Sequence, residues 1–280
     1  MKKQFFKSSL LCLSITSLLF LGCEKAPSSI QQDLSQDCNC ETEAYHGSSA
    51  GTPTKGNLYG RDITYSKVDG LNVWEGDILL TDEQVQSLES QDRGTISTIA
   101  SHVWPNKTVV WKFKTGLDQA TKDKWNAAKA HWEAQTNVEF KVRTNEADYV
   151  QVIKGSGCYS YIGRIGGRQD LSIGSGCSTG NAIHEIGHAI GMYHEHTRTD
   201  RDNDVTVLFQ NITAGYEHNF YVCSNCTANG TLDFGSIMMY GSYSFSKNGQ
   251  PTITKIDGST FNVQRNGLSA NDIGIVATKY

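Results

Sequence analysis

Three histidines and a glutamate stand close together in the sequence, at His184, Glu185, His188 and His194. His184 and His188 are four residues apart, so on a helix they project from one face, one turn apart. Both imidazoles can therefore bind one metal ion. Three neutral imidazoles with an open fourth position suit a catalytic zinc ion, because structural zinc sites usually close with four ligands and use cysteine.

The third histidine reaches the same ion only if the chain leaves the helix. A straight helix would turn His194 roughly 240° away from His188. Gly191 lies between the two, and glycine accepts the left-handed backbone conformation that ends many helices. We therefore expect the helix to stop at Gly191 and the chain to double back, which makes His194 the third ligand.

Glu185 follows the first ligand directly and supplies the remaining group for hydrolysis. Bound Zn²⁺ lowers the pKa of its water towards about 7. The Glu185 carboxylate can take the proton from that water and deliver it to a leaving amine. An accidental helix with core or surface histidines is the alternative, but the long pattern HExxHxxGxxH favours peptide-bond hydrolysis.

Residues 184–202, HEIGHAIGMYHEHTRTDRD, resemble the signature HExxHxxGxxHExxRxDR of the astacin family of metzincin endopeptidases. Two further segments resemble parts of the same family: residues 236–240, SIMMY, its Met-turn, and residues 74–78, WEGDI, the F-x-G-D of its propeptides. The three matches follow in order from about residue 74 to the end. The resemblance implies an α+β, metzincin-like catalytic domain, in which a twisted mixed sheet and two main helices lie above a cleft and an irregular lower subdomain lies below it.

The same resemblance gives roles to single residues in the later part of the chain. Met238 is the apolar floor under the metal, and the Tyr240 phenol stabilises the developing oxyanion unless it is an ordinary core aromatic. Arg265 lies in the pocket after the scissile bond, where bidentate pairing would favour acidic substrate residues, unless it is an exposed arginine. Cys158 and Cys177 form a disulfide.

The resemblance also makes Asp77 an aspartate switch. A carboxylate oxygen is an acceptable zinc ligand, and in the open position it would displace the catalytic water and keep the enzyme latent. An ordinary Gly-Asp turn is the alternative. An activating protease is expected to cut between Asp92 and about Ile99, where Arg93 offers a trypsin-like site. The new N-terminus would then bind Glu195, as the family implies.

The N-terminus is typical of an export signal. Residues 1–22 carry three lysines followed by an apolar run that is too short for a membrane helix. The run ends in LFLGC, which resembles a bacterial lipoprotein signal whose cysteine, here Cys23, is lipidated. We expect an exported protein that is held on the membrane by that anchor or is secreted after processing. An ordinary cleaved signal with an incidental cysteine is the alternative.

These segments divide the chain into four parts. We predict a signal peptide at residues 1–22, a flexible tether at 23–60, a propeptide at 61–93 and an astacin-like domain at 94–280. The tether is rich in Ser, Gln, Asp and Gly and shows no apolar period. Its Cys38 and Cys40 could pair, stay free or bind zinc in a latent form.

Two helices are expected to form the upper half of the domain. Apolar residues at helical spacing predict a helix at residues 117–135, with Trp125 and Trp132 in its buried stripe. The active-site helix is predicted at residues 181–190, with Asn181 as its cap.

Other segments are predicted from alternation and from turn residues. Residues 81–90 favour a short polar helix capped by Thr81. Residues 158–163 are expected to form the edge strand to which extended substrates add by main-chain hydrogen bonds, or simply another strand. Further strands are predicted at residues 109–113, 138–142 and 149–153.

The composition bears on partners and on disulfides. The 280 residues carry a formal net charge of −4, so nothing indicates a nucleic-acid partner. Eight cysteines in an exported chain can form disulfides, and CSNC would give a local bridge between Cys223 and Cys226. His196 and His218 are expected at the surface or beside the ligands, because the zinc set is already complete.

We predict a zinc endopeptidase with one Zn²⁺ per chain, made as a latent, exported precursor and acting on proteins or peptides. A surface protein that kept the fold and lost activity is one alternative, and the presence of Glu185, the three histidines and Tyr240 argues against it. A structural zinc protein, which would unfold on chelation, is the other.

Overall fold

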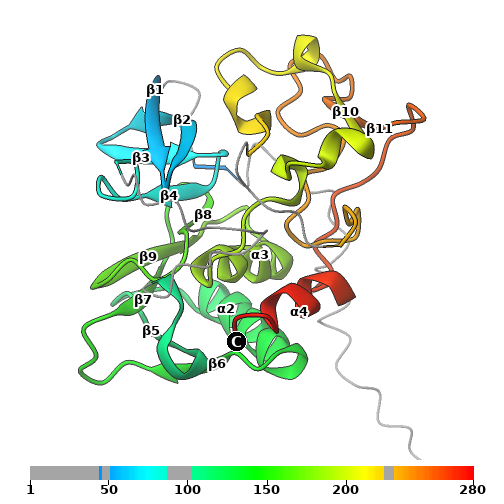
Figure 1. Ribbon diagram of the computed structural model, residues 1–280. Helices are drawn as coiled ribbons and strands as arrows, with labels where there is room; N and C mark the ends of the chain where they lie inside the picture. Colours follow the sequence, from blue (N-terminus) through cyan, green and yellow to red (C-terminus); the bar gives the residue numbers. More distant parts are fainter. Residues whose placement is uncertain (1–43, 46–50, 87–101, 224–229) are drawn as a thin grey trace, which may run out of the picture.

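A nine-stranded sheet runs through this computed structural model, which describes residues 44–45, 51–86, 102–223 and 230–280 (Figure 1). The strands lie in the order β1-β2-β3-β4-β8-β9-β7-β5-β6. The strands of the second half are β5 (Thr108–Phe113), β6 (Glu139–Val142), β7 (Tyr149–Ile153), β8 (Cys158–Tyr161) and β9 (Arg168–Ile173). In this half β8 runs antiparallel to β9, and the other pairs are parallel. The predicted strands and the mixed sheet are confirmed.

The helices α2 (Gln119–Gln135) and α3 (Thr179–Ala189) pack against this half of the sheet (Figure 1). The predicted stripe of α2 is fully buried, including Trp125 and Trp132. The indole N–H of Trp132 donates to the Ile183 carbonyl of α3 at 3.0 Å. The tryptophan therefore fixes the active-site helix to its neighbour as well as filling the core.

A third helix, α4 (Ala270–Val276), is absent from the sequence prediction. It has only seven residues, so its apolar periodicity is too short to be recognised. A capping box marks its start, because the Ser269 hydroxyl accepts the Asp272 N–H and the Asp272 carboxylate accepts the Ser269 N–H. The Ser-x-x-Asp spacing was the available signal.

The chain beyond α3 contains little regular structure in its described part. Its strands β10 (Val205–Val207) and β11 (Ile253–Lys255) form a small antiparallel sheet. Short 3₁₀ turns follow one another around it: η4 (Glu195–Thr197), η5 (Arg201–Asn203), η6 (Phe209–Asn211) and η7 (Glu217–Phe220). The irregular lower subdomain is therefore confirmed (Figure 1).

Four strands precede the domain and extend its sheet: β1 (Thr52–Leu58), β2 (Arg61–Val68), β3 (Leu71–Trp74) and β4 (Ile78–Leu80). They form an antiparallel meander, and its last strand, β4, pairs in parallel with β8. The segment predicted as the propeptide is thus a structured part of the same sheet.

The predicted flexible tether at residues 23–60 is wrong at its C-terminal end. Residues 52–58 form β1, which pairs with β2 along its whole length. β1 is the outermost strand and most of its side chains are at least partly exposed, so its sequence carries no apolar alternation. The earlier part of the tether, with Cys38 and Cys40, lies outside the described residues.

The predicted polar helix at residues 81–90 is only a turn within its described part. Thr81 caps that turn as expected, since its hydroxyl accepts the Gln84 N–H and its own N–H donates to the Gln84 side chain. Gln86 then bridges to Asn57 of β1. At Gln86, the last described residue of this segment, a tertiary contact with a strand therefore takes the place of a helical one.

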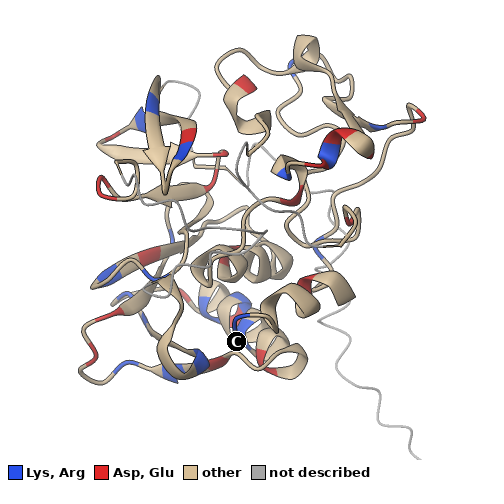
Figure 2. Cartoon of the chain, in the orientation of Figure 1, with Lys and Arg blue, Asp and Glu red and all other residues tan. Residues whose placement is uncertain are grey.

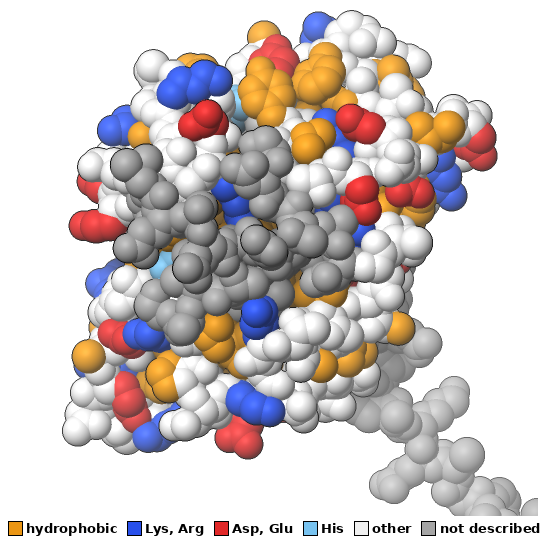
Figure 3. Space-filling view, viewed as in Figure 1, with side chains coloured by type: hydrophobic (Ala, Val, Ile, Leu, Met, Phe, Trp, Pro, Cys, Tyr) orange, Lys and Arg blue, Asp and Glu red, His pale blue; other side chains and the backbone are white. Residues whose placement is uncertain are grey.

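Acidic and basic side chains are interspersed over the described surface (Figures 2 and 3). None of the described helices is long and apolar enough to cross a membrane. The predicted signal, Cys23 and the activation segment at residues 92–99 lie outside the described residues, so these calls stay predictions.

Candidate metal centre and active site

The active-site helix α3 begins with a capping box. The Ser178 hydroxyl accepts the Asn181 N–H at 3.2 Å, and the Asn181 side-chain oxygen accepts the Ser178 N–H at 2.7 Å. The prediction of Asn181 as the cap is therefore wrong, because Ser178 caps the helix and Asn181 is its reciprocal partner in the first turn. From this start, His184 and His188 fall on one face, as the spacing requires.

The chain reverses at Gly191, as predicted. Gly191 has a φ of +102°, which residues with a side chain rarely adopt. Its N–H donates to the His188 carbonyl, and the Met192 N–H donates to the Gly187 carbonyl. The reversal brings the ring of His194 to 4.7 Å from that of His188, measured between centroids.

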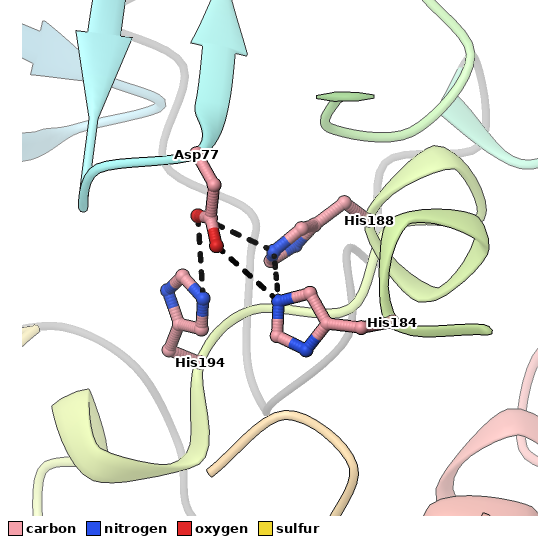
Figure 4. Close-up of side chains that lie close together, drawn as sticks. All are labelled: Asp77, His184, His188 and His194. Carbon is pink, nitrogen blue, oxygen red and sulfur yellow. Dashed lines mark hydrogen bonds and ion pairs between the residues drawn. The ribbon is translucent and has the colours of Figure 1, made fainter. Parts of the chain in front are cut away.

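Each of the three imidazoles is held by a hydrogen bond from Nδ1. The acceptors are the carbonyl of Ile237 for His184, the carbonyl of Met192 for His188 and the carboxylate of Glu75 for His194, at 2.7, 2.8 and 2.8 Å. These oxygens only accept, so the proton of each neutral ring lies on Nδ1 and a lone pair lies on Nε2. All three Nε2 lone pairs face the same point (Figure 4).

The convergence of these lone pairs favours a bound cation. The Nε2 atoms of His184 and His188 are 3.0 Å apart, and two lone pairs at that distance repel each other. The nearest Asp77 carboxylate oxygens lie 3.4, 3.6 and 3.3 Å from the Nε2 atoms of the three histidines. A tetrahedral zinc ion with bonds of about 2.0–2.1 Å separates its ligand atoms by about 3.3–3.4 Å. The three imidazoles and the carboxylate therefore fit one Zn²⁺.

The electrostatics of the cluster agree with metal binding. Burial and the nearby Arg265 guanidinium lower the pKa of His184 to about 3, which keeps the ring in its neutral, ligating form. Burial also opposes charge on His194, but Asp77 and Glu75 outweigh it and raise the pKa of that ring to about 9. The two carboxylates thus attract a positive charge to this position, whether a proton or a metal ion.

The Met-turn at residues 236–240 lies against α3. A Cβ atom on Gly187 would lie 2.8 Å from the Met238 sulfur, so the helix needs a glycine there for the methionine to approach. Met238 therefore packs against the helix between its two histidines, in keeping with the predicted floor. The predicted base, Glu185, is buried on the same helix with 1% of its surface exposed.

The carboxylate of Asp272, a residue that the sequence reasoning missed, anchors the Met-turn. It accepts hydrogen bonds from the Ser236 hydroxyl at 2.6 Å and from the Ile237 N–H at 2.9 Å. The carbonyl of Ile237 in turn orients His184. The first residues of α4 thus anchor the N–H of the same residue whose carbonyl sets the direction of a ligand.

Tyr240 lies in the site but is bonded to Glu75, in the segment predicted as the propeptide. Its hydroxyl donates to the main-chain carbonyl of Glu75. Its ring stacks on that of His196, with centroids 3.8 Å apart and planes inclined by 21°. His196 is fully buried beside the site, with its ring 5.4 Å from that of His194. His218 is buried as well, and its ring is bonded to the Ser66 hydroxyl of β2, so neither histidine lies at the surface.

The segment that carries Asp77 is shaped by two residues with positive φ. Glu75 and Gly76 have φ values of +48° and +81°. A Cβ on Gly76 would lie 2.8 Å from the Phe245 ring, so only glycine fits. Glu75 is a second contact that the sequence reasoning missed, since its carboxylate binds His194 and its carbonyl binds Tyr240. The WEGD motif at residues 74–77 contains both Glu75 and Asp77, but its resemblance to the family's F-x-G-D indicates a role only for the aspartate.

The predicted edge strand β8 is covered in this form of the protein. Residues 78–80 pair with it as β4, and the Ser160 N–H donates to the Asp77 carbonyl at 3.0 Å. The strand β8 is therefore paired on both sides in this structure and is not an edge of the sheet.

Arg265 and Glu195 are both buried. Arg265 is 5% exposed, which rules out the alternative of an exposed arginine, and it donates to the Ile237 carbonyl at 2.9 Å. Glu195 accepts from the Asp233 N–H and from Arg198, and burial raises its pKa to about 7. The acidic preference and the binding of a new N-terminus stay predictions.

The predicted disulfide between Cys158 and Cys177 is present. Cys223 is also disulfide-bonded. Its predicted pairing with Cys226 stays a prediction, because Cys226 lies outside the described residues.

Comparison with known proteins identifies the family of the chain. The peptidase family described as Astacin matches residues 97–280. The chain belongs to the astacin family. A solved astacin-like structure, high choriolytic enzyme 1, a hatching enzyme zinc-protease from Oryzias latipes, shares 34% identity with a TM-score of 0.59, covering 64% of this chain and 94% of that one. The predicted metzincin fold is therefore confirmed.

Curated relatives extend the comparison with the astacin family. Blastula protease 10 of Paracentrotus lividus is 40% identical over 204 residues, which are 66% of this chain and 34% of the relative. Protein SpAN of Strongylocentrotus purpuratus is 32% identical over 277 residues, 91% of this chain and 44% of the relative. Astacin-like metalloprotease toxin 1 of Loxosceles intermedia is 40% identical, over 64% of this chain and 68% of the relative. The chain thus spans less than half the length of the first two.

The anchoring role of Asp272 predicts that Asp272→Ala weakens both the fold and the metal centre. The Ser236 hydroxyl and the Ile237 N–H lose their acceptor, so the free energy of unfolding, measured in urea, should fall by about 2–4 kcal/mol. Zinc affinity, measured by competition with a chromogenic chelator, should fall about tenfold or more, because the Ile237 carbonyl no longer fixes His184. Asp257→Ala is the control, since that exposed carboxylate accepts the N–H and the hydroxyl of the adjacent Ser259. Equal zinc affinity in both variants would contradict the anchoring role.

Proposed function

We propose that this astacin-family protein is a zinc-dependent endopeptidase in its latent form. The observation that carries the proposal is the convergence of three imidazole lone pairs and one carboxylate on a single point. The three imidazoles come from α3 and the turn after it, whereas the carboxylate comes from the segment before β4. A donor set in which one ligand belongs to a removable segment is typical of a catalytic centre held closed, and not of a structural zinc site.

In the proposed reaction, separate residues bind the metal, transfer the proton and stabilise the oxyanion. His184, His188 and His194 would hold Zn²⁺, which when bound supplies a Lewis acid and lowers the pKa of a water molecule. Glu185 takes a proton from the attacking water and passes it to the leaving amine nitrogen. Tyr240, once its hydroxyl is released from the propeptide, donates a hydrogen bond to the substrate carbonyl oxygen as negative charge develops there.

Latency rests on three sets of contacts made by the propeptide segment. Asp77 occupies the fourth ligand position. The Glu75 carbonyl holds the hydroxyl of Tyr240. The strand β4 pairs with β8, to which an extended substrate would otherwise add its main chain. The ligand position, the oxyanion donor and the substrate strand are therefore all blocked together.

Activation follows from where these blocking contacts lie in the sequence. We propose a cut by another protease near Arg93, after which the propeptide segment leaves and the new N-terminus binds the buried Glu195. The same cut would free the enzyme from a lipid anchor at Cys23, because the inhibitor lies between the anchor and the domain. The substrates are exported proteins or peptides, with acidic residues after the cut favoured if Arg265 reaches the bound chain.

The role of Glu185 predicts that Glu185→Gln separates metal binding from activity. The activated variant should keep one zinc per chain by metal analysis, because the three histidines are unchanged. Its kcat/KM on peptides should fall by about 10²–10⁴-fold, because the general base is lost. Appreciable turnover with full zinc content would refute the assignment of the base.

The latch predicts that the uncut Asp77→Ala precursor cleaves peptides, whereas the uncut wild type does not. Activity should rise further in the double variant with Glu75→Ala, because the Glu75 carboxylate otherwise keeps the segment bonded to His194. Asp62→Ala is the matched control, an exposed propeptide carboxylate that contacts the Asn57 side chain and not the site. A zinc-loaded Asp77→Ala precursor without activity would place the latch elsewhere.

The same contacts predict that activation loosens the metal. The precursor holds zinc with the Asp77 ligand and with the Glu75 carboxylate behind His194, so a chelator should remove zinc at least about tenfold more slowly from the precursor than from the cut enzyme. Chelation of the cut enzyme should abolish cleavage without unfolding it, as followed by circular dichroism. Global unfolding on chelation would instead favour a structural zinc protein.

A further inference from the structure

The side chain of Asn219, in η7, is buried without a hydrogen-bond partner among the described residues. It is 1% exposed, and both its Oδ1 and its Nδ2 lack a partner there. Its main chain is engaged, since the Asn219 carbonyl accepts the Nε2–H of His196 at 2.9 Å. Burying an amide without hydrogen bonds costs free energy of folding, because the group loses its bonds to water. Packing alone therefore does not explain an asparagine at this position.

The amide faces the propeptide main chain beside the metal centre. A Cβ built on Gly76 would lie 3.4 Å from the Asn219 Nδ2, 3.4 Å from the Tyr240 hydroxyl and 2.8 Å from the Phe245 ring. Gly76 directly precedes Asp77, whose carboxylate lies against the three histidines (Figure 4). Asn219 therefore borders the space that the propeptide backbone fills next to the fourth ligand position.

His196 contacts both Asn219 and Tyr240, the two polar residues that border this space. His196, which donates to the Asn219 carbonyl, also stacks on Tyr240. One histidine thus ties η7 to the Met-turn, and the amide and the phenol keep their relative positions when the propeptide leaves. The space admits main chain only, because Phe245 leaves no room for a Cβ at the place of Gly76.

We propose that in the activated enzyme Asn219 hydrogen-bonds the main chain of the substrate next to the scissile bond. This inference rests on the proposed endopeptidase function. A carboxamide offers one acceptor and two donors, which match the N–H and C=O of a peptide group. Among the described residues the polar groups of Asn219 are unmet in the latent form. The amide of Asn219 gains hydrogen-bond partners when substrate replaces the propeptide, and these hydrogen bonds stabilise the substrate complex.

The test uses the activated enzyme and a series of peptides with one known cleavage site. In each peptide one main-chain amide near the scissile bond, but never the scissile one, is replaced by an ester, which removes the N–H and weakens the C=O as an acceptor. The kcat/KM for the scissile bond is measured with wild type and with Asn219→Ala. Asn219→Ser, which keeps a smaller donor and acceptor, replaces the alanine variant if that variant does not fold.

Asn219→Ala is expected to lower kcat/KM about 3- to 20-fold for the all-amide peptide, the range for one hydrogen bond in a buried site. At one position the ester should impair wild type but not the variant, because the partner is already gone. Asn211→Ala is the matched control. Its side chain donates to the Pro251 carbonyl, so it should lower the Tm of the precursor more than Asn219→Ala does, and leave the ester profile of wild type unchanged.

The outcomes separate this inference from the proposed function. An activated, zinc-loaded wild type that cuts no peptide refutes the endopeptidase function and the inference with it. If wild type cuts and every ester impairs wild type and Asn219→Ala equally, the inference alone is overturned. It is also overturned if Asn219→Ala lowers the precursor Tm as much as Asn211→Ala and leaves kcat/KM unchanged, since Asn219 would then be an ordinary structural residue.

Discussion

The mutual repulsion of three inward-facing nitrogen lone pairs is the constraint on which the rest of this structure depends. Each ring is oriented by an oxygen that accepts its Nδ1 proton, so no ring can turn its own N–H inward to relieve the repulsion. A cation resolves the conflict, and a buried carboxylate from Asp77 adds the charge that favours it. The cluster is therefore arranged for a metal ion before any substrate is considered.

The residues that accept the Nδ1 hydrogen bonds lie at very different sequence separations from their histidines. Met192 is four residues from His188, and Ile237 is 53 residues from His184. Glu75 is 119 residues from His194 and belongs to the segment that activation would remove. A carboxylate of the proposed propeptide thus orients one of the three imidazoles, and in the proposed activation the ring of His194 would exchange that partner for another.

The segment proposed as the propeptide covers the groups that a substrate would use in the proposed function. It adds a strand to β8, places a carboxylate at the metal centre and holds Tyr240 by a main-chain carbonyl. Within the described part of the chain it leaves the Asn219 amide unbonded. If the proposed latency holds, a segment that covers these groups while making only some of their hydrogen bonds would leave bonds for a substrate to gain.

From the sequence we could predict that His184, His188 and His194 lie together and that the chain reverses at Gly191, because these features follow from the repeat of a helix and from the freedom of φ in glycine, which are local properties. The prediction of Glu185 as the base follows from its place directly after the first histidine. The sequence also indicated Asp77 through the order of motifs. The contacts of Glu75 and Asp272, the surroundings of Asn219 and the pairing of β1 became visible only in the tertiary structure, because each involves atoms far away in the chain. Most of those partners are backbone carbonyls, N–H groups or a glycine without a side chain, which leave no signature in the sequence.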